Sequence, residues 1–359
     1  MNLEQLKSIL YFPKIRSSRP FSKRAQNLIF FHEETLLKKA WTILFLPISL
    51  FWLLGCYIKI ILSRKKEFDI PIISIGNIEA GGTGKTPLTI EIAKIIKDVK
   101  TRISIICYTA NRKYPDESIL ISRTIKQTTI YQGKNRRRLI DIAIENNPDI
   151  IIIDDGFQYF DIANKIDIIL LDPEIPLNLL IPSGRMRFPS WFLKYADAIV
   201  IKQTKKNMRF YKDFLKKIEA YHKPIFFAQY HIKEVIDLQN NKIPVAMLKN
   251  KNVIAFCGIA KPKSFIETIS ETGVYKIYAI WYPDHFVYHQ SDINEIENLF
   301  KNTKADLILT TEKDMVKIRE FNIDFPVYSL NIEMDVEPYD KFKSWIMNEI
   351  FPPSHFLKI

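Results

Sequence analysis

The chain has 359 residues, of which 47% are hydrophobic and 26% are charged, a composition that excludes an intrinsically disordered protein. The length allows two domains with separate hydrophobic cores. Basic residues exceed acidic residues by 52 to 40, giving a formal net charge of +12. Such an excess suggests an anionic partner, for example a nucleic acid, a phosphorylated substrate or an acidic membrane face.

The basic residues gather in four clusters. These are Lys14–Arg24, Arg64–Lys66, Lys134–Arg138 and Lys202–Arg209. A solvated basic surface is the simpler interpretation of any single cluster. The clusters are not interleaved with aromatic residues, as they are in platforms that stack on nucleotide bases. We therefore expect no nucleic-acid partner.

The N-terminal segment and the cysteines bear on where the protein is located. Residues 1–34 are basic and contain no signal-peptide pattern, because no short apolar core follows the start. We interpret them as a basic N-terminal extension. Cys56, Cys107 and Cys257 lie far apart and match no metal-ligand spacing. Three scattered cysteines are typical of unpaired thiols in a reducing compartment.

A long apolar segment, Trp41–Leu62, dominates residues 35–66, which we predict to form a membrane-associated helix. The segment carries one charge, at Lys59, and basic residues flank it on both sides. Its length is sufficient to span a bilayer. Pro47, Gly55 and the aromatic residues along it are instead typical of an interfacial helix. Both arrangements stay open, whereas a soluble core helix is disfavoured because the flanks are so basic.

A strand, a glycine-rich turn and a helix follow next. Residues 70–75 are a β-branched apolar run, the turn reads G-G-T-G-K-T over residues 81–86, and apolar residues recur at helical spacing after Pro87. In a phosphate-binding loop, backbone N–H groups converge on phosphate oxygens at the positive end of the helix. Lys85 is predicted to reach the terminal phosphates, and the Thr86 hydroxyl is predicted to hold a magnesium ion.

The turn departs from the general P-loop pattern at Glu79, which stands where that pattern has a glycine. A plain glycine turn ahead of a helix is the alternative interpretation. The strand ahead of the turn and the adjacent lysine and threonine favour binding of a nucleotide triphosphate. The predicted nucleotide-binding residues are Glu79, Ala80, Gly81, Gly82, Thr83, Gly84, Lys85 and Thr86.

Two series of short apolar runs, alternating with helical segments, predict an α/β fold with a mostly parallel sheet covered by helices. The first series lies in a P-loop NTPase-like core of residues 67–235. A polar passage, residues 233–249, separates the two series, and we expect a domain boundary near residues 230–250. The second series lies in a smaller C-terminal α/β domain of residues 248–350. The predicted strands are 70–75, 102–107, 149–154, 166–171, 198–201, 224–228, 252–257, 275–280 and 306–310.

Two adjacent acids, Asp154 and Asp155, end one of the predicted strands. A nucleotide-binding sheet needs an acid at a strand end near the P-loop to hold magnesium or its waters. Because a P-loop lies upstream, we predict a metal site formed by these acids and Thr86. A strand-end turn or a helix cap is the alternative for such residues.

Two charged segments of the second domain are further candidates for the site. Asp284 and His285 lie in a loop after a predicted strand, and a histidine there could help an acid that deprotonates a hydroxyl group. A solvent-facing loop histidine is the alternative. Residues 312–314 (Glu-Lys-Asp) follow the next strand, either as a charged helix start or as a wall of the site.

Taken together, these motifs resemble the tetraacyldisaccharide 4'-kinase family. The resemblance covers the chain after residue 35 and is specific in the order of its motifs. They are IPIISIGNIEAGGTGKTP (70–87), DDGFQ (154–158), IPSGRMR (181–187), CGIAKPKSF (257–265), PDHF (283–286) and TTEKD (310–314).

The resemblance implies an activity, a location and an architecture. Members phosphorylate the 4'-hydroxyl of a tetraacylated glucosamine disaccharide 1-phosphate, using ATP and Mg²⁺, to give lipid IVA in lipid A biosynthesis. They act at the cytoplasmic face of the inner membrane. Their fold joins a P-loop core to a smaller α/β domain, with the active site in the cleft between the two. We expect a monomer that contacts the membrane surface.

The resemblance also implies roles for individual residues. A GDEP segment of the family supplies an aspartate base that pairs with the histidine of the PDHF motif. The matching residues here make Asp116 the candidate base and His285 its partner, with Lys85 as the third catalytic residue. The same resemblance assigns Asn77, Gln158 and Arg187 to substrate binding.

The chain departs from the family at three segments. Pro115 and Ser118 stand where the GDEP segment has its glycine and its proline, so a surface turn is the alternative for Asp116. Residues 107–110 read C-Y-T-A where the family has S-R-G-Y, and Phe188 stands where the family has an acid after Arg187. Two other functions therefore stay open. One is a membrane-associated P-loop ATPase that acts as a switch, and the other is a family member that binds ATP without transferring phosphate.

Overall fold

The computed structural model describes residues 10–11, 36–80, 84–97, 101–108, 116–175, 177–203 and 208–352. These residues fall into two compact units. Unit 1 consists of residues 230–333 together with the two-residue strand β1 (Leu10–Tyr11), and unit 2 of residues 36–229 and 334–352. Strands β8 (Ile225–Asp237) and β13 (Val327–Glu337) each begin in one unit and end in the other. The chain therefore passes between the units twice.

Unit 2 is built on a parallel sheet with the strand order β8-β7-β6-β2-β5-β3-β4. Every residue of β2 and of β5 is buried, because helices cover both faces and isoleucine-rich runs bury apolar side chains on each of them. The strands not yet delimited are β2 (Ile72–Gly76), β3 (Ile103–Tyr108), β4 (Thr129–Gly133), β5 (Ile150–Asp154), β6 (Lys165–Leu171) and β7 (Ala198–Lys202).

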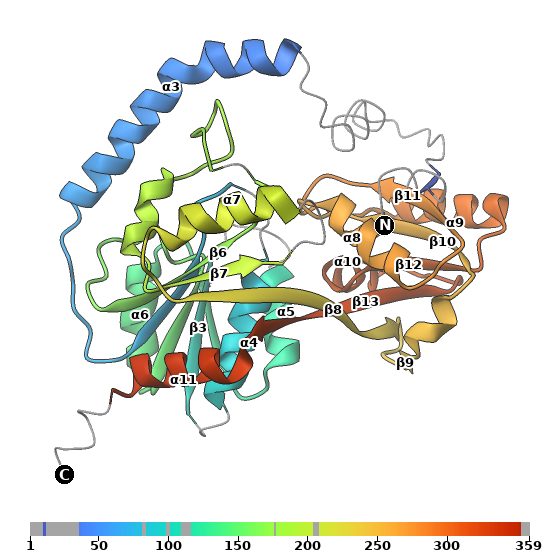
Figure 1. Ribbon diagram of the computed structural model, residues 1–359. Helices are drawn as coiled ribbons and strands as arrows, with labels where there is room; N and C mark the ends of the chain where they lie inside the picture. The colour runs from blue at the N-terminus through green and yellow to red at the C-terminus, as the bar shows by residue number, and fades with distance from the viewer. Residues whose placement is uncertain are drawn as a thin grey trace. The chain divides into compact units, whose positions relative to one another are not determined.

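The helices of unit 2 cover the sheet from both sides (Figure 1). α7 places Phe214 and Ile218 in a core with residues of β6 and β7, whereas Phe342 of α11 packs against Phe226 of β8. α4 contacts β2 and β5, and α6 contacts β3 and β4. The bounds are α4 (Lys85–Lys97), α5 (Asp116–Thr124), α6 (Arg136–Ile144), the 3₁₀ helix η1 (Ser190–Tyr195), α7 (Met208–Glu219) and α11 (Tyr339–Ile350).

The apolar segment near the N-terminus forms one long helix, α3 (Leu36–Ile61), drawn in blue in Figure 1. Among the described residues it is the one helix long and apolar enough to cross a membrane, by length and composition alone. Only 11% of its residues 42–61 are buried. Large apolar side chains along it are exposed, up to 74% at Phe51 and 76% at Ile61. The helix therefore presents an extended apolar surface.

Polar atoms of α3 attach the helix to the segment of residues 180–187. The Ser49 hydroxyl donates to the carbonyl oxygen of Leu180 at 3.0 Å and accepts from the backbone N–H of Ser183 at 3.2 Å. One turn further on, Trp52 Nε1 donates to the carbonyl oxygen of Arg187 at 2.8 Å. These hydrogen bonds fix which side of α3 faces the segment of residues 180–187.

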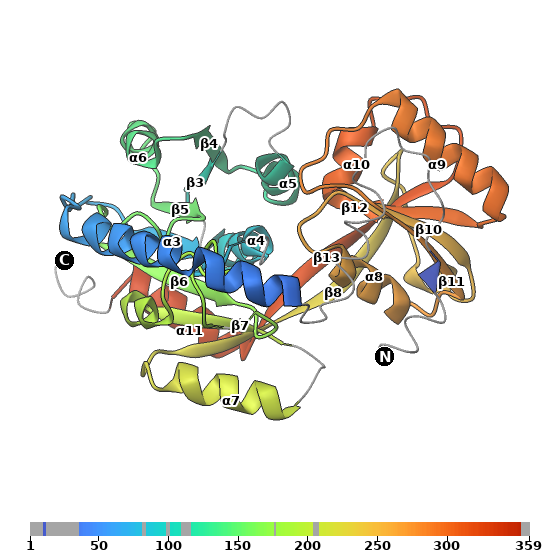
Figure 2. The same cartoon turned by 90° about the horizontal axis from the view of Figure 1, so that it is seen from above.

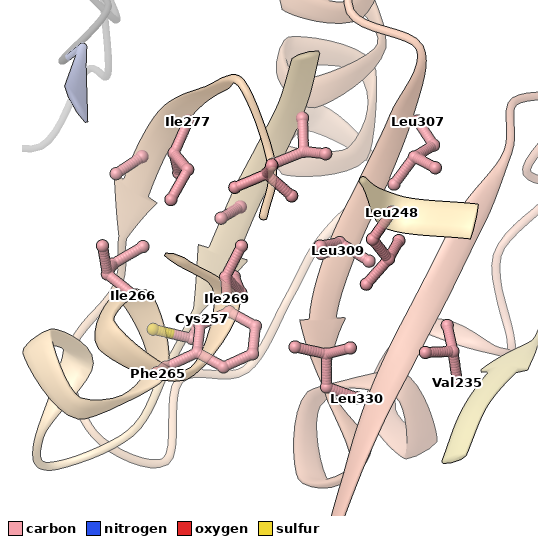
Figure 3. Packing of buried hydrophobic residues seen from close by; sticks show 14 of the residues in the cluster. Val235, Leu248, Cys257, Phe265, Ile266, Ile269, Ile277, Leu307, Leu309 and Leu330 are labelled. Atoms are coloured by element: carbon pink, nitrogen blue, oxygen red, sulfur yellow. The ribbon is translucent and has the colours of Figure 1, made fainter. Parts of the chain in front are cut away.

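Unit 1 has its own parallel sheet, with the strand order β1-β11-β10-β12-β13. Successive residues of β10 alternate between two cores, because side chains of a strand point to opposite faces. Val253 and Ala255 lie in the core covered by α8, shown in Figure 3, and Ile254 and Phe256 lie in the core covered by α9 and α10. Figure 2 shows these helices on either side of the strands.

The remaining elements of unit 1 are short. They are β9 (Lys242–Ile243), the 3₁₀ helix η2 (Val245–Leu248), β10 (Asn252–Cys257), α8 (Pro262–Glu271), β11 (Lys276–Trp281), α9 (Gln290–Thr303), β12 (Leu307–Thr311) and α10 (Glu312–Ile318). β9 pairs antiparallel with the end of β8.

The structure confirms the mostly parallel α/β fold and each predicted strand to within a few residues, but it differs from the sequence predictions in three places. Part of the polar passage 233–249 continues strand β8 to Asp237. The C-terminal range 248–350 is not one unit, because α11 packs on β8 and residues 334–352 belong to unit 2. Strands β4 and β13 and the two-residue strands β1 and β9 were not among the predicted strands.

Candidate active site

The carboxyl ends of β2 and β5 lie side by side at one edge of the unit 2 sheet. The two strands are parallel neighbours, with Ile75 opposite Asp154. β2 leads into the P-loop and α4, and β5 ends at the acidic pair. Ligands of open α/β sheets bind at such carboxyl ends. Gly84, just ahead of α4, has a φ of 97°, a left-handed conformation that glycine adopts without strain.

Asp154 accepts hydrogen bonds from the first turns of α4. Its Oδ2 accepts from the Thr86 hydroxyl at 3.0 Å, and its Oδ1 accepts from the Thr89 hydroxyl at 3.4 Å. The Asp154 residue is only 6% exposed. The structure therefore brings together two of the three predicted metal ligands, Thr86 and Asp154, at the start of the P-loop helix.

Asp155 lies between two cations. Lys85 Nζ is 3.3 Å from one of its carboxylate oxygens, and Arg187 Nη1 is 3.2 Å from both. Burial raises the pKa of the Asp155 carboxyl, but the charges of Lys85, Arg187 and Arg136 outweigh burial and hold this pKa below its usual value. Asp155 is therefore an anion at neutral pH, beside the lysine predicted to bind phosphate.

The backbone of Asp155 is in the left-handed region, with a φ of 58°. A non-glycine residue in that region costs roughly 1–3 kcal/mol and persists only where its surroundings fix it. Such residues cluster at functional sites. The next residue, Gly156, donates its N–H to the carbonyl oxygen of Ile75 at 3.0 Å, which ties this turn to the end of β2.

A fully buried arginine, Arg136, holds the backbone of the acidic pair, Asp154 and Asp155. Its Nη2 donates to the backbone carbonyl oxygen of Asp154 at 3.1 Å, and its Nη1 donates to the Tyr159 hydroxyl at 2.7 Å. The guanidinium carbon lies 5.0 Å from the centre of the Tyr108 ring and 4.8 Å from that of Tyr159. Cation–π contacts and two hydrogen bonds compensate for the burial of this charge.

The sequence prediction for Arg136 was wrong, because its cluster was interpreted as a solvated surface. The neighbouring Arg138 is exposed, but the side chain of Arg136 is 0% exposed. Arg136 is the first residue of α6, after the N-cap Asn135, and α6 lies against β3 and β4. The residue types of the basic run do not by themselves tell which of its arginines is buried.

The segment before the P-loop pairs with the segment that carries Arg187. The N–H of Ala80 donates to the carbonyl oxygen of Arg185 at 2.6 Å, and the N–H of Arg187 donates to that of Ile78 at 2.8 Å. Between them, Glu79 and Met186 form an antiparallel bridge. This pairing holds Arg187 next to the P-loop, which is why its guanidinium reaches Asp155.

Glu79, which departs from the general P-loop pattern, is completely buried. Its Oε1 accepts the backbone N–H of Asp172 at the end of β6, at 3.4 Å. Asp172 in turn lies 3.7 Å from Lys202 Nζ of β7. The glutamate side chain thus connects the P-loop strand to its neighbours in the sheet, and that is the role that the described contacts give it.

The predicted substrate-binding residues Asn77 and Gln158 follow β2 and β5 on the same edge. Asn77 is 2% exposed, and Gln158 is partly exposed. The two turns lie in close contact, because a Cβ added at Gly76 would be only 2.3 Å from Phe157 Cβ. Residues 81–83 of the predicted loop, Gly81, Gly82 and Thr83, lie outside the described residues.

Phe188, which stands where the resembling family has an acid, belongs to an aromatic cluster. Its ring stacks on Phe192 at 5.0 Å between centroids and meets Phe157 and Phe160 edge-on at 5.9 and 5.8 Å. The residue is 6% exposed. The side chain is therefore part of the core beneath the site, and the neighbouring Arg187 keeps its contact with Asp155.

The predicted catalytic histidine lies in unit 1. His285 is in the loop after β11, as expected, and has a φ of 57°. Its Nε2 is 3.6 Å from an oxygen of Asp284, whose other oxygen is 3.9 Å from Lys313 Nζ. Asp116 is the first residue of α5 in unit 2, and its side chain lies outside the described residues. The pairing of Asp116 with His285 stays a prediction.

Comparison with known proteins gives consistent matches over most of the chain. Residues 41–350 match the family model of tetraacyldisaccharide-1-P 4'-kinase. A tetraacyldisaccharide 4'-kinase from Aliarcobacter butzleri is 31% identical over 323 residues, which are 86% of this chain and 91% of the relative. One from Syntrophus aciditrophicus is 30% identical over 320 residues, 80% of this chain and 86% of the relative.

A solved structure matches the fold. The crystal structure of LpxK from Aquifex aeolicus in complex with ATP aligns with a TM-score of 0.69 at 24% sequence identity. The alignment covers 88% of this chain and all of that one. At this identity the likeness establishes the fold, including the mostly parallel sheet that carries the P-loop.

Proposed function

The chain belongs to the tetraacyldisaccharide-1-P 4'-kinase family, and we propose that it transfers a phosphoryl group from ATP to the 4'-hydroxyl of a tetraacyldisaccharide 1-phosphate. The reaction would yield lipid IVA for lipid A biosynthesis. The observation that carries the proposal within the molecule is the cluster of Lys85, Asp155 and Arg187 at the P-loop.

The two cations of this cluster would bind the phosphates of ATP. The two cations share one counterion, the ionised Asp155. Phosphate oxygens would compete with Asp155 for both cations. A lysine next to the P-loop amides and a forked guanidinium are suited to the charge that spreads over the transferred phosphoryl group. Lys85 and Arg187 would therefore stabilise the transition state.

Thr86, Asp154 and Asp155 would hold a magnesium ion. They fit this ion because they offer oxygen atoms only, and because Thr86 Oγ1 and Asp154 Oδ2 already lie 3.0 Å apart. When bound, magnesium neutralises charge on the phosphate oxygens. Arg136 would keep Asp154 in place through its carbonyl oxygen.

Asp116 would act as the general base and His285 as its partner. As the bond between the sugar oxygen and the γ-phosphorus forms and the bond to the β-phosphate oxygen breaks, the proton of the 4'-hydroxyl would pass to the Asp116 carboxylate, and ADP would leave. General base catalysis of this kind contributes typically 10²–10⁴-fold. Asp116 is the first residue of α5, and the positive end of a helix keeps a carboxylate in the ionised form that can accept a proton.

The lipid acceptor would reach the site along α3. We propose that the helix lies on or in the cytoplasmic face of the inner membrane through its exposed apolar side chains. Its polar side is bonded to residues 180–187, the segment that ends at Arg187. The acyl chains could thus stay in the membrane while the sugar reaches Arg187, and Asn77 and Gln158 would contact it there.

The test is transfer of labelled γ-phosphate from ATP to a tetraacyldisaccharide 1-phosphate in detergent micelles. Wild-type protein should transfer label, and Lys85→Ala should lose roughly 10²-fold or more in kcat because an electrostatic contact of the transition state is removed. Lys94→Ala is the matched control, since Lys94 lies on the same helix and pairs with Glu91. An equal rate in Lys85→Ala would refute the proposal, and ATP hydrolysis independent of the lipid would favour the ATPase switch.

A further inference from the structure

Three segments that the proposed mechanism leaves largely unexplained meet at one edge of the unit 1 sheet. Gly258 follows β10, residues 282–288 follow β11, and residues 312–317 follow β12. The three strands are parallel neighbours in the order β11-β10-β12. Their carboxyl ends therefore lie together, where an α/β sheet places functional loops. His285 is in the second of these segments.

Asp314 is the centre of this junction. The residue is 0% exposed, although a carboxylate is almost never fully buried unless it is paired. Its Oδ2 accepts from the backbone N–H of Gly258 at 2.9 Å and from the Thr311 hydroxyl at 2.7 Å. Its Oδ1 lies 3.4 Å from Nζ of Lys317, which is 3% exposed. Both oxygens are thus used, and one of them binds the loop after β10.

Gly258, whose N–H is bound by Asp314, in turn binds the loop of residues 282–288, here called the histidine loop. The carbonyl oxygen of Gly258 accepts the backbone N–H of His285 at 3.1 Å, and that of Cys257 accepts the N–H of Tyr282 at 2.9 Å. Two successive hydrogen bonds therefore connect the buried carboxylate to the backbone of His285. Lys313, next to Asp314 in α10, also reaches this loop, at 3.9 Å from Asp284.

The histidine loop needs such support because its backbone is strained. His285 has a left-handed φ of 57°, a conformation that a non-glycine residue keeps only when its surroundings impose it. The fit at Gly258 is tight: an added Cβ would lie 3.1 Å from Phe286 Cβ and 3.2 Å from both Asp314 Oδ1 and the Pro283 carbonyl oxygen. The loop and the carboxylate thus both pack against the same glycine.

We propose that Asp314 is a positioning residue for His285, acting through the Gly258 peptide. A buried ion pair is weak evidence of a contribution to stability, because its desolvation offsets its attraction. The Asp314–Lys317 pair instead provides a fixed hydrogen-bond acceptor. It holds the loops after β10 and β11 in place at the carboxyl edge of the sheet. The inference rests on the proposed catalytic role of His285, and it explains why the CGIAKPKSF, PDHF and TTEKD motifs occur together.

The experiment compares full-length variants by two measurements. The first is hydrogen–deuterium exchange of the peptide that spans Tyr282–Phe286. The second is kcat for phosphate transfer from ATP to the lipid disaccharide, with the KM for ATP. The test variants are Asp314→Asn and the double variant Asp314→Asn/Lys317→Met, which removes both buried charges and so leaves no unpaired cation.

Asp306→Asn is the matched control. Asp306 also accepts a backbone N–H of β10, that of Asn252 at 2.8 Å, and also pairs with a lysine, Lys251 at 3.1 Å. It lies just before β12, at the opposite end of the same strands. Its loss therefore weakens the connection between β10 and β12 without touching the histidine loop.

We expect both Asp314 variants to exchange the Tyr282–Phe286 amides about tenfold faster, while the β10 amides keep their protection. We expect kcat to fall about tenfold or more, with the KM for ATP within about twofold of wild type. Asp306→Asn should change neither quantity. A role in stability alone would raise exchange throughout unit 1 instead of in the histidine loop.

Unchanged exchange in the histidine loop, or faster exchange with an unchanged kcat, would overturn the inference. If both Asp314 variants fail to fold, Gly258→Ala decides by the same two measurements, because its methyl group disturbs the junction without removing a charge. Should wild-type protein transfer no phosphate to the lipid, the proposed function fails. The exchange result then still shows whether Asp314 holds the loop.

Discussion

Trp52 of the apolar helix donates its indole N–H to the carbonyl oxygen of Arg187 at 2.8 Å, and the guanidinium of the same arginine binds Asp155 at 3.2 Å. Arg187 therefore links the apolar helix α3 to the charged cluster of Lys85, Asp155 and Arg187 at the P-loop. Cys56 Sγ, one turn along the helix, lies 3.6 Å from the same carbonyl oxygen. Ser49, Trp52 and Cys56 of α3 thus bond to the segment of residues 180–187. The large side chains on the exposed side of α3 are apolar.

The exposed side of α3 should control binding to membranes. Phe51 is 74% exposed, and burying a phenylalanine in an apolar phase contributes about 1.5–3 kcal/mol. Phe51→Glu should therefore lower binding to anionic phospholipid vesicles by roughly tenfold or more, measured by co-sedimentation. Tyr275→Glu, at a 69% exposed residue of unit 1, should bind like wild type. Equal binding by the two variants would contradict a membrane role for α3.

Arg136 should set both the position and the charge state of the acidic pair. Arg136→Met removes the donor to the Asp154 carbonyl oxygen and is expected to cost about 1–3 kcal/mol of stability. It also removes one of the charges that lower the pKa of Asp155. That pKa should rise, so the acid side of the pH–rate profile should move to higher pH.

Arg138→Met is the control for Arg136, because it removes the same charge from an exposed position of α6. Arg136→Lys should restore the pH profile more fully than the stability, since it keeps the charge but not both hydrogen bonds. Identical pH profiles in wild type and Arg136→Met would show that the buried charge does not act on Asp155.

Gly76 should tolerate no side chain. A Cβ there would lie 2.3 Å from Phe157 Cβ and 2.9 Å from Phe157 N, so Gly76→Ala is expected to cost about 1–3 kcal/mol or more by overpacking. Because the clash pushes the acidic turn away from the P-loop strand, ATP affinity should fall as well. Thermal unfolding and ATP titration measure the two effects.

Gly55 provides the contrasting substitution. It lies inside α3, and nothing lies within 4 Å of an added Cβ. Gly55→Ala should leave ATP binding unchanged and stabilise the helix by about 0.5–1 kcal/mol, because alanine loses less backbone entropy than glycine. A loss of stability in Gly55→Ala comparable to that in Gly76→Ala would show that the predicted clash is not the cause.

Asp167 should make the free energy of unfolding depend on pH. Burial raises the pKa of its carboxyl to about 6, against the opposing charge of Lys165. The folded protein therefore holds this proton more tightly than the unfolded chain does. The unfolding free energy should decrease as the pH rises from about 4 to about 6 and then level off. Denaturant unfolding between pH 4 and 7 measures this slope, and Asp167→Asn should reduce it.

Asp149 supplies a control of opposite sign. Hydrogen bonds from Arg102 hold the pKa of its carboxyl below the usual value, so its contribution to stability is present at neutral pH and is lost at low pH. Asp149→Asn should therefore leave the slope between pH 4 and 6 unchanged. If Asp167→Asn leaves that slope unchanged too, the slope arises from another group.

The sequence was sufficient to predict the parts of the site that local pattern determines. The strand, the glycine turn and the lysine–threonine pair identify the P-loop, and Asp154 was found because a short apolar run ends there. The contact between Lys85 and Asp155 follows from the parallel pairing of β2 with β5. Arg187 was assigned only through the family resemblance.

Features that depend on long-range packing could not be predicted in this way. α11 lies 110 residues or more beyond the β8 residue Phe226 that it packs against, and no local pattern reveals that partner. Arg136 resembles its exposed neighbours in sequence. Asp314 looks like an ordinary acid in a helix start, and only the pairing of β10 with β12 shows that it is buried.

The double passage of the chain through β8 and β13 makes unit 1, apart from β1, an insertion in unit 2. The nucleotide-binding unit is thus encoded in two pieces, and its helix α11 is translated after unit 1. A gene designed to express that unit alone has to join residue 229 to residue 334 by a linker. A gene that stops at residue 229 would leave Phe226 without its aromatic contact with Phe342.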